Sequence, residues 1–385
     1  MSPAARPLGV SLALAAAIAA TTGCPDREAP ASSSSDPGPA GAAGEAATLP
    51  VELRAEALAD VVRDAQRDPR RGIFVPPSAK EMEVMEGLTA SLGAAARDSG
   101  RTAAAGPTEG PGPGADGPPP RGSLAPPAAA PAGLPPAFGP VERWAVGAAS
   151  VGFELFALES AASRLVVLRE AQDARRGGGI YALRAVIRGR PLVLQAPHAF
   201  HDVGTGDLAR EAFEATGAAA LTLNTVHRHL GAREGAPSSG SPADVAHVPM
   251  SHFQGATRGL ARALPRAVFC QIHGYSAARH PELSGIDLVA SRGEASAVAD
   301  PAFDRLVDRL ERLAGKGRVA VYGRDPRADR LGATRNVQGR FLNAYSDDAF
   351  YHLELSAGLR ERLGQEPALR AEFIAALGAL VEEAP

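Results

Sequence analysis

Metal-binding and acid–base side chains are concentrated in one part of this 385-residue chain. All nine histidines fall between His198 and His352. The densest group is the segment His198-Ala-Phe-His201-Asp202, which follows the apolar run 191–196 after one proline, Pro197. Imidazole nitrogens and carboxylate oxygens bind zinc at about 2.0–2.2 Å, so two ligands from this loop can reach one ion. A polar loop whose histidines hydrogen-bond backbone groups is the alternative interpretation of the segment taken alone.

Two further groups follow later in the chain. His273 comes directly after the apolar run 267–272 and precedes a glycine, which permits a close backbone turn. Glu354 lies inside the otherwise apolar run 349–355, where a carboxylate is costly unless it is paired or functional. The two-residue period of a strand puts His352 on the same face as Glu354. These groups offer a third metal ligand and a general base.

The elements that must position these groups alternate along the chain. Strands are expected at 180–187, 191–196, 219–223, 267–272, 287–291, 318–322 and 349–355, and helices at 207–216, 251–264, 304–314 and 367–382. Strands that alternate with helices of about ten or more residues predict an α/β domain with a mostly parallel or mixed sheet flanked by helices. Ligands bind at the carboxyl ends of the strands in such sheets, where the histidine groups lie.

The order of these motifs resembles the zinc carboxypeptidase-like hydrolases, the group that includes N-formylglutamate amidohydrolases and poly-γ-glutamate hydrolases. The matching segments, all within 193–360, are Pro197-His198, Gly204-Thr205, Ile272-His273-Gly274 and Leu353-Glu354-Leu355-Ser356. The resemblance implies one zinc ion held by a histidine and a carboxylate of the first loop and by a later histidine. His198, Asp202 and His273 are therefore the expected ligands, and Glu354 is the expected general base.

One departure from the family pattern leaves the second ligand open. The family motif is His-x-x-Glu, whereas here His201 occupies the third position after His198 and Asp202 the fourth. We prefer Asp202 because the family uses one carboxylate in this loop; His201 is the alternative and would complete a three-histidine site.

The resemblance also implies a reaction. Three protein ligands leave a fourth position on zinc for a water molecule with a pKa of about 7. This water is the expected nucleophile on an amide, either a peptide or an acyl-amino-acid bond, and Glu354 would take its proton. A non-catalytic lipoprotein binding module on the same fold is the alternative function.

Substrate binding is expected from arginines near the strand ends. Arg228 follows the strand expected at 219–223, and Arg335 is followed by Asn336. A guanidinium group can hold a carboxylate through two parallel hydrogen bonds, and related hydrolases use arginines for acidic substrates. Surface arginines in an arginine-rich chain are the alternative. The segment 244–247, Asp-Val-Ala-His, is expected to orient a ligand histidine or to bind substrate.

The N-terminal segment predicts export and lipid attachment. Arg6 precedes an apolar run of 13 residues at 8–20, which suits a signal peptide and is too short to span a bilayer. The small residues before Cys24 resemble the lipobox of bacterial lipoproteins, which implies an acylated Cys24 and an extracytoplasmic, lipid-anchored place in the cell envelope or periplasm. An ordinary secretory signal is the alternative. Cys270 then has no intrachain partner and is expected to be a small buried hydrophobe.

Composition divides the chain into five parts. We predict a signal peptide at 1–24, a disordered tether at 25–50, a short helical segment at 51–98, a Pro/Gly-rich linker at 99–137 and the α/β domain at 138–385. Helices are expected over 51–67 and 78–97, and Ser78 with Glu81 fits a capping box at the start of the second.

Charge and composition exclude several classes of protein. A formal net charge of −3 gives no electrostatic case for nucleic-acid binding. No apolar run reaches the roughly 18 residues of a spanning helix, and two cysteines cannot staple a disulfide scaffold. The expected partners are a lipid membrane, through acylated Cys24, and a small peptide or acidic amide substrate.

Overall fold

The computed structural model describes residues 52–67, 72–105, 142–159, 163–232, 240–294, 299–345 and 350–382. The predicted signal peptide and tether, with Cys24, and most of the predicted linker lie outside these residues. No helix in the described part of the chain is long and apolar enough to cross a membrane. Lipid attachment and the disordered tether therefore stay predictions.

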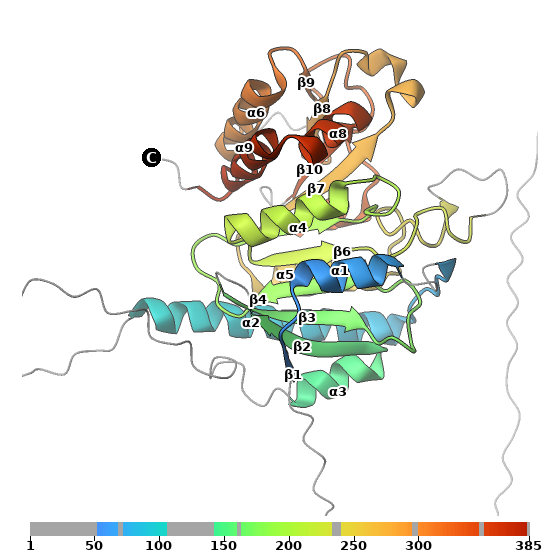
Figure 1. The fold of residues 1–385 in the computed structure, drawn as a ribbon, viewed down its shortest axis with the longest axis vertical. Helices are drawn as coiled ribbons and strands as arrows, with labels where there is room; N and C mark the ends of the chain where they lie inside the picture. The colour runs from blue at the N-terminus through green and yellow to red at the C-terminus, as the bar shows by residue number, and fades with distance from the viewer. Residues whose placement is uncertain are drawn as a thin grey trace, which may run out of the picture. The chain divides into compact units, whose positions relative to one another are not determined.

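In the described part of the chain, ten strands form one mixed sheet in the order β1-β2-β3-β4-β6-β5-β7-β10-β8-β9 (Figure 1). The strands are β1 (Glu52–Arg54), β2 (Phe153–Glu159), β3 (Arg164–Glu170), β4 (Ile180–Arg184), β5 (Leu192–Ala196), β6 (Ala220–Leu223), β7 (Val268–Tyr275), β8 (Leu288–Ser291), β9 (Val319–Val321) and β10 (Phe350–Ser356). The central strands β6, β5, β7 and β10 pair in parallel, and β10 pairs antiparallel with β8. This arrangement confirms the predicted α/β fold with a mixed sheet flanked by helices.

Helices cover both faces of the sheet because strands buried on both faces need an apolar layer on each side. One apolar core lies beneath α1 (Leu58–Arg67), α4 (Thr205–Thr216), α6 (Pro301–Ala314), α8 (Ala357–Gln365) and α9 (Pro367–Gly378). The core on the opposite face lies beneath α2 (Ala79–Ala105), α3 (Glu142–Ser150), α5 (His252–Ala263) and α7 (Val337–Tyr345). Cys270 of β7 is buried as a free thiol, which confirms that it is a small buried hydrophobe.

The N-terminal elements belong to the same sheet and cores as the rest of the described chain. The sequence predicts a helix over 51–67, but the structure has β1 paired in parallel with β2 before α1 begins. Helix α2 continues to Ala105, beyond the boundary placed at residue 98, and packs on α5. The guanidinium of Arg97 on α2 donates to the carbonyl oxygen of Ala263 at 2.7 Å. A fragment that starts at residue 138 would therefore lack part of the sheet and of both cores.

Local chemistry predicted from the sequence defines the start of α2. The Ser78 N–H donates to Glu81 Oε2 at 2.7 Å, and the Glu81 N–H donates to Ser78 Oγ at 3.2 Å. These two bonds confirm the capping box. Partial burial acts to raise the pKa of Glu81, but the Ser78 amide and the guanidinium of Arg176 outweigh it and lower this pKa to about 2.

The connections change direction around β5. From β5 the chain passes through α4 to β6 on one side, and from β6 it passes through α5 to β7 on the other side of β5. Helices α4 and α5 cover opposite faces of the sheet. The carboxyl end of β5 is therefore a topological switch point, the place where α/β sheets bind ligands. The carboxyl ends of β7 and β10 lie at the same edge because both strands run parallel to β5.

Candidate metal centre

His198 lies two residues after β5, in a tight turn that brings Asp202 beside it. The N–H groups of His201 and Asp202 both donate to the His198 carbonyl oxygen, at 2.8 Å each. Residues four apart lie on the same side of such a helical turn. His198 Nδ1 is 3.5 Å from Asp202 Oδ2, and both side chains are buried. His201 lies elsewhere, with its Nδ1 3.0 Å from His227 Nε2. The structure therefore places Asp202, and not the alternative ligand His201, next to His198.

His273 reaches the same point from β7. The strand continues to Tyr275, so His273 lies inside the strand and not directly after it. Its Nδ1 is 3.0 Å from His198 Nδ1 and 3.6 Å from Asp202 Oδ2. The Gly274 N–H donates to the same carboxylate oxygen at 3.0 Å. Burial acts to raise the pKa of Asp202, but the neighbouring imidazoles of His198 and His273 outweigh burial and hold this pKa well below its ordinary value.

The protons of the two imidazoles are held away from this meeting point. His198 Nε2 lies 2.8 Å from Asp244 Oδ1, and His273 Nε2 lies 3.1 Å from Gln271 Oε1. Both oxygens only accept, so each neutral imidazole donates from Nε2 and leaves Nδ1 unprotonated. Arg228 Nη1 donates to His198 Nδ1 at 3.0 Å, which requires the same tautomer. Burial lowers the pKa of His273 to about 4, so its ring is neutral at pH 7.

The three donor atoms fit a divalent metal. Bonds of about 2.0–2.2 Å in a tetrahedral site place neighbouring ligand atoms about 3.3–3.6 Å apart. The separations between the nitrogens of His198 and His273 and the oxygen of Asp202 are 3.0, 3.5 and 3.6 Å. The two unprotonated nitrogens and the carboxylate oxygen all carry lone pairs, and no proton lies between them to form a hydrogen bond. A bound cation would therefore complement these three atoms. All three are donor types that zinc accepts.

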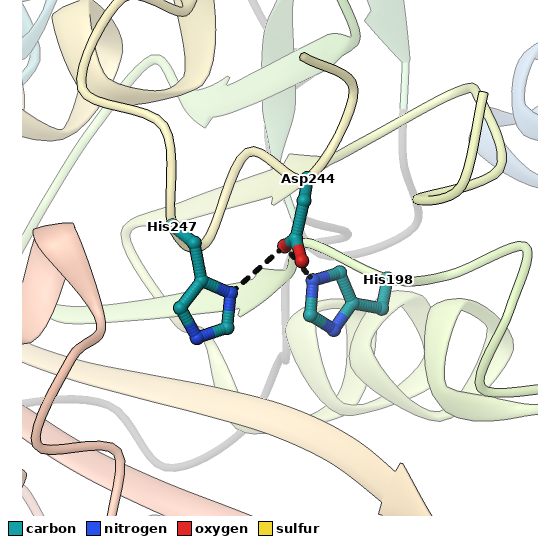
Figure 2. Close-up of side chains that lie close together, drawn as sticks. All are labelled: His198, Asp244 and His247. Atoms are coloured by element: carbon teal, nitrogen blue, oxygen red, sulfur yellow. Dashed lines mark hydrogen bonds and ion pairs between the residues drawn. The ribbon is translucent and has the colours of Figure 1, made fainter. Parts of the chain in front are cut away.

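Asp244 orients His198 from outside this group. Figure 2 shows its carboxylate between His198 and His247; Oδ1 lies 3.0 Å from His247 Nδ1 as well as 2.8 Å from His198 Nε2. Its Oδ2 accepts from Arg228 Nη2 at 2.6 Å. Burial acts to raise the pKa of Asp244, but these partners outweigh burial and hold this pKa well below its ordinary value. A carboxylate that accepts the far N–H of a ligand histidine fixes the tautomer and the direction of the ring.

Glu354 lies beside His273, one of the three candidate ligands. It is directly opposite His273 in the parallel pairing of β10 with β7, so both side chains are on one face of the sheet. Within the described residues its Oε2 is buried without a hydrogen-bond partner, and its Oε1 lies 3.6 Å from His352 Nε2. Burial and the negative charge of Asp202 raise the pKa of Glu354 well above its ordinary value. A carboxyl group with a raised pKa and a free oxygen is suited to accept and release a proton.

Two further residues, His352 and Gln271, contribute to the site although the sequence pattern assigned no role to either. The His352 ring is buried with its centroid 4.5 Å from that of His273, and His352, His273 and Glu354 form a further group of potential metal ligands. Gln271 holds His273 and accepts from Asn336 Nδ2 at 2.7 Å. The signal that identifies both residues is polar side chains at a two-residue period in apolar strands.

A pocket of about 420 Å³ opens over these groups, a volume suited to a small ligand. The three residues predicted to bind substrate all line it. Arg335 is exposed, whereas Arg228 is held by Asp244 and His198. The Asn336 amide is occupied within the protein, because its Nδ2 bonds Gln271 and its Oδ1 accepts from the Gly339 N–H.

The chain is similar to solved structures only at a distance. No protein-family model and no curated relative matches it. An N-formylglutamate amidohydrolase from Ralstonia eutropha JMP134 is 14% identical, with a TM-score of 0.36 over 51% of this chain and 94% of that one. A bacteriophage poly-γ-glutamate hydrolase is 15% identical, with a TM-score of 0.32 over 54% of this chain and 91% of that one. These scores carry no argument about activity, so the function has to be inferred from the site itself.

Proposed function

We propose that this protein is a metal-dependent hydrolase that cleaves an amide bond in a peptide or acyl-amino-acid compound. The observation that carries the proposal is the convergence of His198 Nδ1, His273 Nδ1 and Asp202 Oδ2, at separations of 3.0–3.6 Å. The buried, unpartnered Oε2 of Glu354 supports it, since a binding protein has no need for a free buried carboxylate beside a metal site.

His198, Asp202 and His273 would hold the metal ion. We propose zinc, because two imidazoles and one carboxylate are a common ligand set of catalytic zinc sites. A divalent ion bound there polarises a carbonyl oxygen and lowers the pKa of water. Arg228 must release His198 Nδ1 for that nitrogen to serve as a ligand, and its second nitrogen keeps it attached to Asp244.

The remaining side chains act on the proton and on the substrate. Glu354 accepts the proton of the attacking water at Oε2 and gives it to the leaving amine. Arg335, exposed in the pocket, and Arg228, once it is released from His198, bind a carboxylate of the substrate. The substrate class we propose is therefore a small peptide or an acidic amide.

We also propose that acylated Cys24 anchors the domain to a membrane of the cell envelope, outside the cytoplasm. The apolar run at 8–20 and the small residues before Cys24 support this. Growth of the expressing bacterium with an alkyne fatty acid should label the wild-type chain and not Cys24→Ser. Equal labelling of both chains would contradict the anchor.

The test of the activity uses the full chain. We expect bound zinc in the wild type and in Glu354→Gln by elemental analysis, and about one equivalent less in His273→Ala. Release of free amine from a panel of N-acyl amino acids and dipeptides should fall about 10²–10⁴-fold in Glu354→Gln. Glu361→Gln, which changes an exposed glutamate of α8, is the matched control and should keep both zinc and activity.

Two results would overturn the proposal. Folded wild-type protein with no metal that depends on His273 would remove the metal centre. Unchanged turnover in Glu354→Gln would remove the assigned base. Zinc that depends on His273, without turnover of any amide, would favour the non-catalytic binding module.

A further inference from the structure

A second group of histidines lies next to the metal centre, in two loops, and the proposed reaction does not use it. His201 follows β5, and His227 and His229 follow β6. His201 Nδ1 is 3.0 Å from His227 Nε2. The ring centroids are 4.8 Å apart for His201 and His227, 4.8 Å for His201 and His229, and 5.3 Å for His227 and His229. We call these three residues the outer histidine cluster.

The ring spacing of the outer histidine cluster matches that of three imidazoles around one ion. The nitrogens of His201 and His227 already meet, whereas the His229 ring has to turn before its nitrogen can join them. In a zinc site the ligand nitrogen lies about 2.0–2.1 Å from the metal and the ring centre about 1.1 Å farther, so tetrahedral angles put ring centres about 5.2 Å apart. The three observed centroid distances span 4.8–5.3 Å. The backbone N–H of His229 donates to His227 Nδ1 at 3.2 Å and directs His227 Nε2 toward His201. Metal binding would move the His227 proton to Nδ1 and release this contact.

The surroundings of the cluster leave it open to a cation from solvent. Among the described ion pairs, none joins any of these three imidazoles to a carboxylate, so no ion pair has to be broken. His227 is exposed and the other two rings are partly exposed, in contrast to the buried His198 and His273. Arg228 lies between His227 and His229 in the sequence; its guanidinium donates to Asp244, while burial and this positive charge both contribute to lowering the pKa of all three imidazoles.

We propose that His201, His227 and His229 form a second metal site, which binds a divalent transition ion such as Zn²⁺, Ni²⁺ or Cu²⁺. Three neutral imidazoles favour these ions over Mg²⁺ and Ca²⁺, which prefer oxygen ligands. An ion held there joins the loop after β5 to the loop after β6. These loops carry Asp202 and Arg228, so the second site would stiffen one wall of the metal centre. The proposal does not depend on the proposed hydrolase activity.

The test is calorimetric titration of the metal-free full chain with Ni²⁺. We expect about two equivalents to bind the wild type and about one to bind either His227→Ala/His229→Ala or His198→Ala/His273→Ala. His280→Ala is the matched control, because it removes a histidine that contacts Glu282 and no other imidazole, and it should bind as the wild type does. Circular dichroism of each variant checks that it is folded.

The outcomes separate the two sites. One equivalent in the wild type that is lost in His227→Ala/His229→Ala and kept in His198→Ala/His273→Ala would support the outer site and contradict the metal centre. The same stoichiometry in the wild type and in His227→Ala/His229→Ala would overturn the outer site. If the double variants do not fold, the milder variant His229→Gln can be used instead. It should weaken Ni²⁺ binding at the outer histidine cluster about tenfold or more. An unchanged titration curve in that variant would overturn the proposal.

Discussion

The Asp244 carboxylate is buried and serves three partners at once, so its replacement by asparagine tests how the metal centre is held. Oδ1 contacts His198 Nε2 and His247 Nδ1, and Oδ2 accepts from Arg228. Asparagine keeps the shape but replaces one oxygen by an NH₂ group. If the remaining oxygen faces His198, the NH₂ group meets the guanidinium of Arg228, donor against donor. If the oxygen faces Arg228, the NH₂ group meets His198 Nε2 and drives the imidazole proton onto Nδ1, the nitrogen expected to bind the metal.

The magnitude follows from these two orientations. The first loses a hydrogen bond to a charged group, about 1.5–3 kcal/mol. The second loses the orientation of a ligand histidine, which typically costs about 10–100-fold in metal affinity. A factor of 10–100 corresponds to about 1.4–2.8 kcal/mol of zinc-binding free energy, whereas the cost of the first orientation is a loss of folding stability. We expect Asp244→Asn to bind zinc about 10–100-fold more weakly than the wild type.

The assay is competition for zinc with a chromophoric chelator, together with thermal unfolding of the metal-free protein to verify the fold. The control is His247→Ala, which removes another partner of Oδ1 and leaves His198 and Arg228 in place. This variant should bind zinc within about threefold of the wild type. Wild-type affinity in folded Asp244→Asn, or an equal loss in His247→Ala, would refute the role assigned to Asp244.

Three further predictions concern the fold. A Cβ at Gly259 of α5 would clash with the Glu86 carbonyl oxygen of α2, so Gly259→Ala should lower the unfolding free energy in urea by about 2 kcal/mol or more. Gly358→Ala, where nothing lies within 4 Å, should not lower it, and equal effects would refute the close helix contact. Burial raises the pKa of Cys270 to about 12. In a variant that lacks the other cysteine, an aromatic disulfide reagent at pH 8 should therefore label Cys270 about 100-fold more slowly in the folded protein than in the denatured protein. Equal labelling rates would show that the core around Cys270 is open. The pKa of Glu81 is lowered from 4.5 to about 2. The difference in unfolding free energy between the wild type and Glu81→Gln should therefore be largest above about pH 4.5 and decrease toward pH 2. A difference that stays constant with pH in urea titrations would contradict this.

Features that depend on neighbouring residues could be predicted from the sequence. The apolar runs before His198 and His273 and around Glu354 predict the central strands, because a strand buried on both faces has to be apolar along its length. The capping box of Ser78 and Glu81 is likewise written in four consecutive residues. Strands β2 and β3 were not predicted, because periodicity alone does not distinguish apolar runs of seven residues in strands from those in helices.

Contacts between distant segments depend on the order and register of the strands, and only the tertiary structure decides those. The spacing in the sequence allows either Asp202, which we prefer, or His201 as a ligand; the turn after β5 puts Asp202 beside His198 and places His201 in the outer histidine cluster. The pairing of β7 with β10 puts Glu354 opposite His273, although the two residues are far apart in the chain. Local hydrogen bonds and hydrophobic burial can specify each strand. The strand ends that carry the site residues come together only when the whole sheet is assembled.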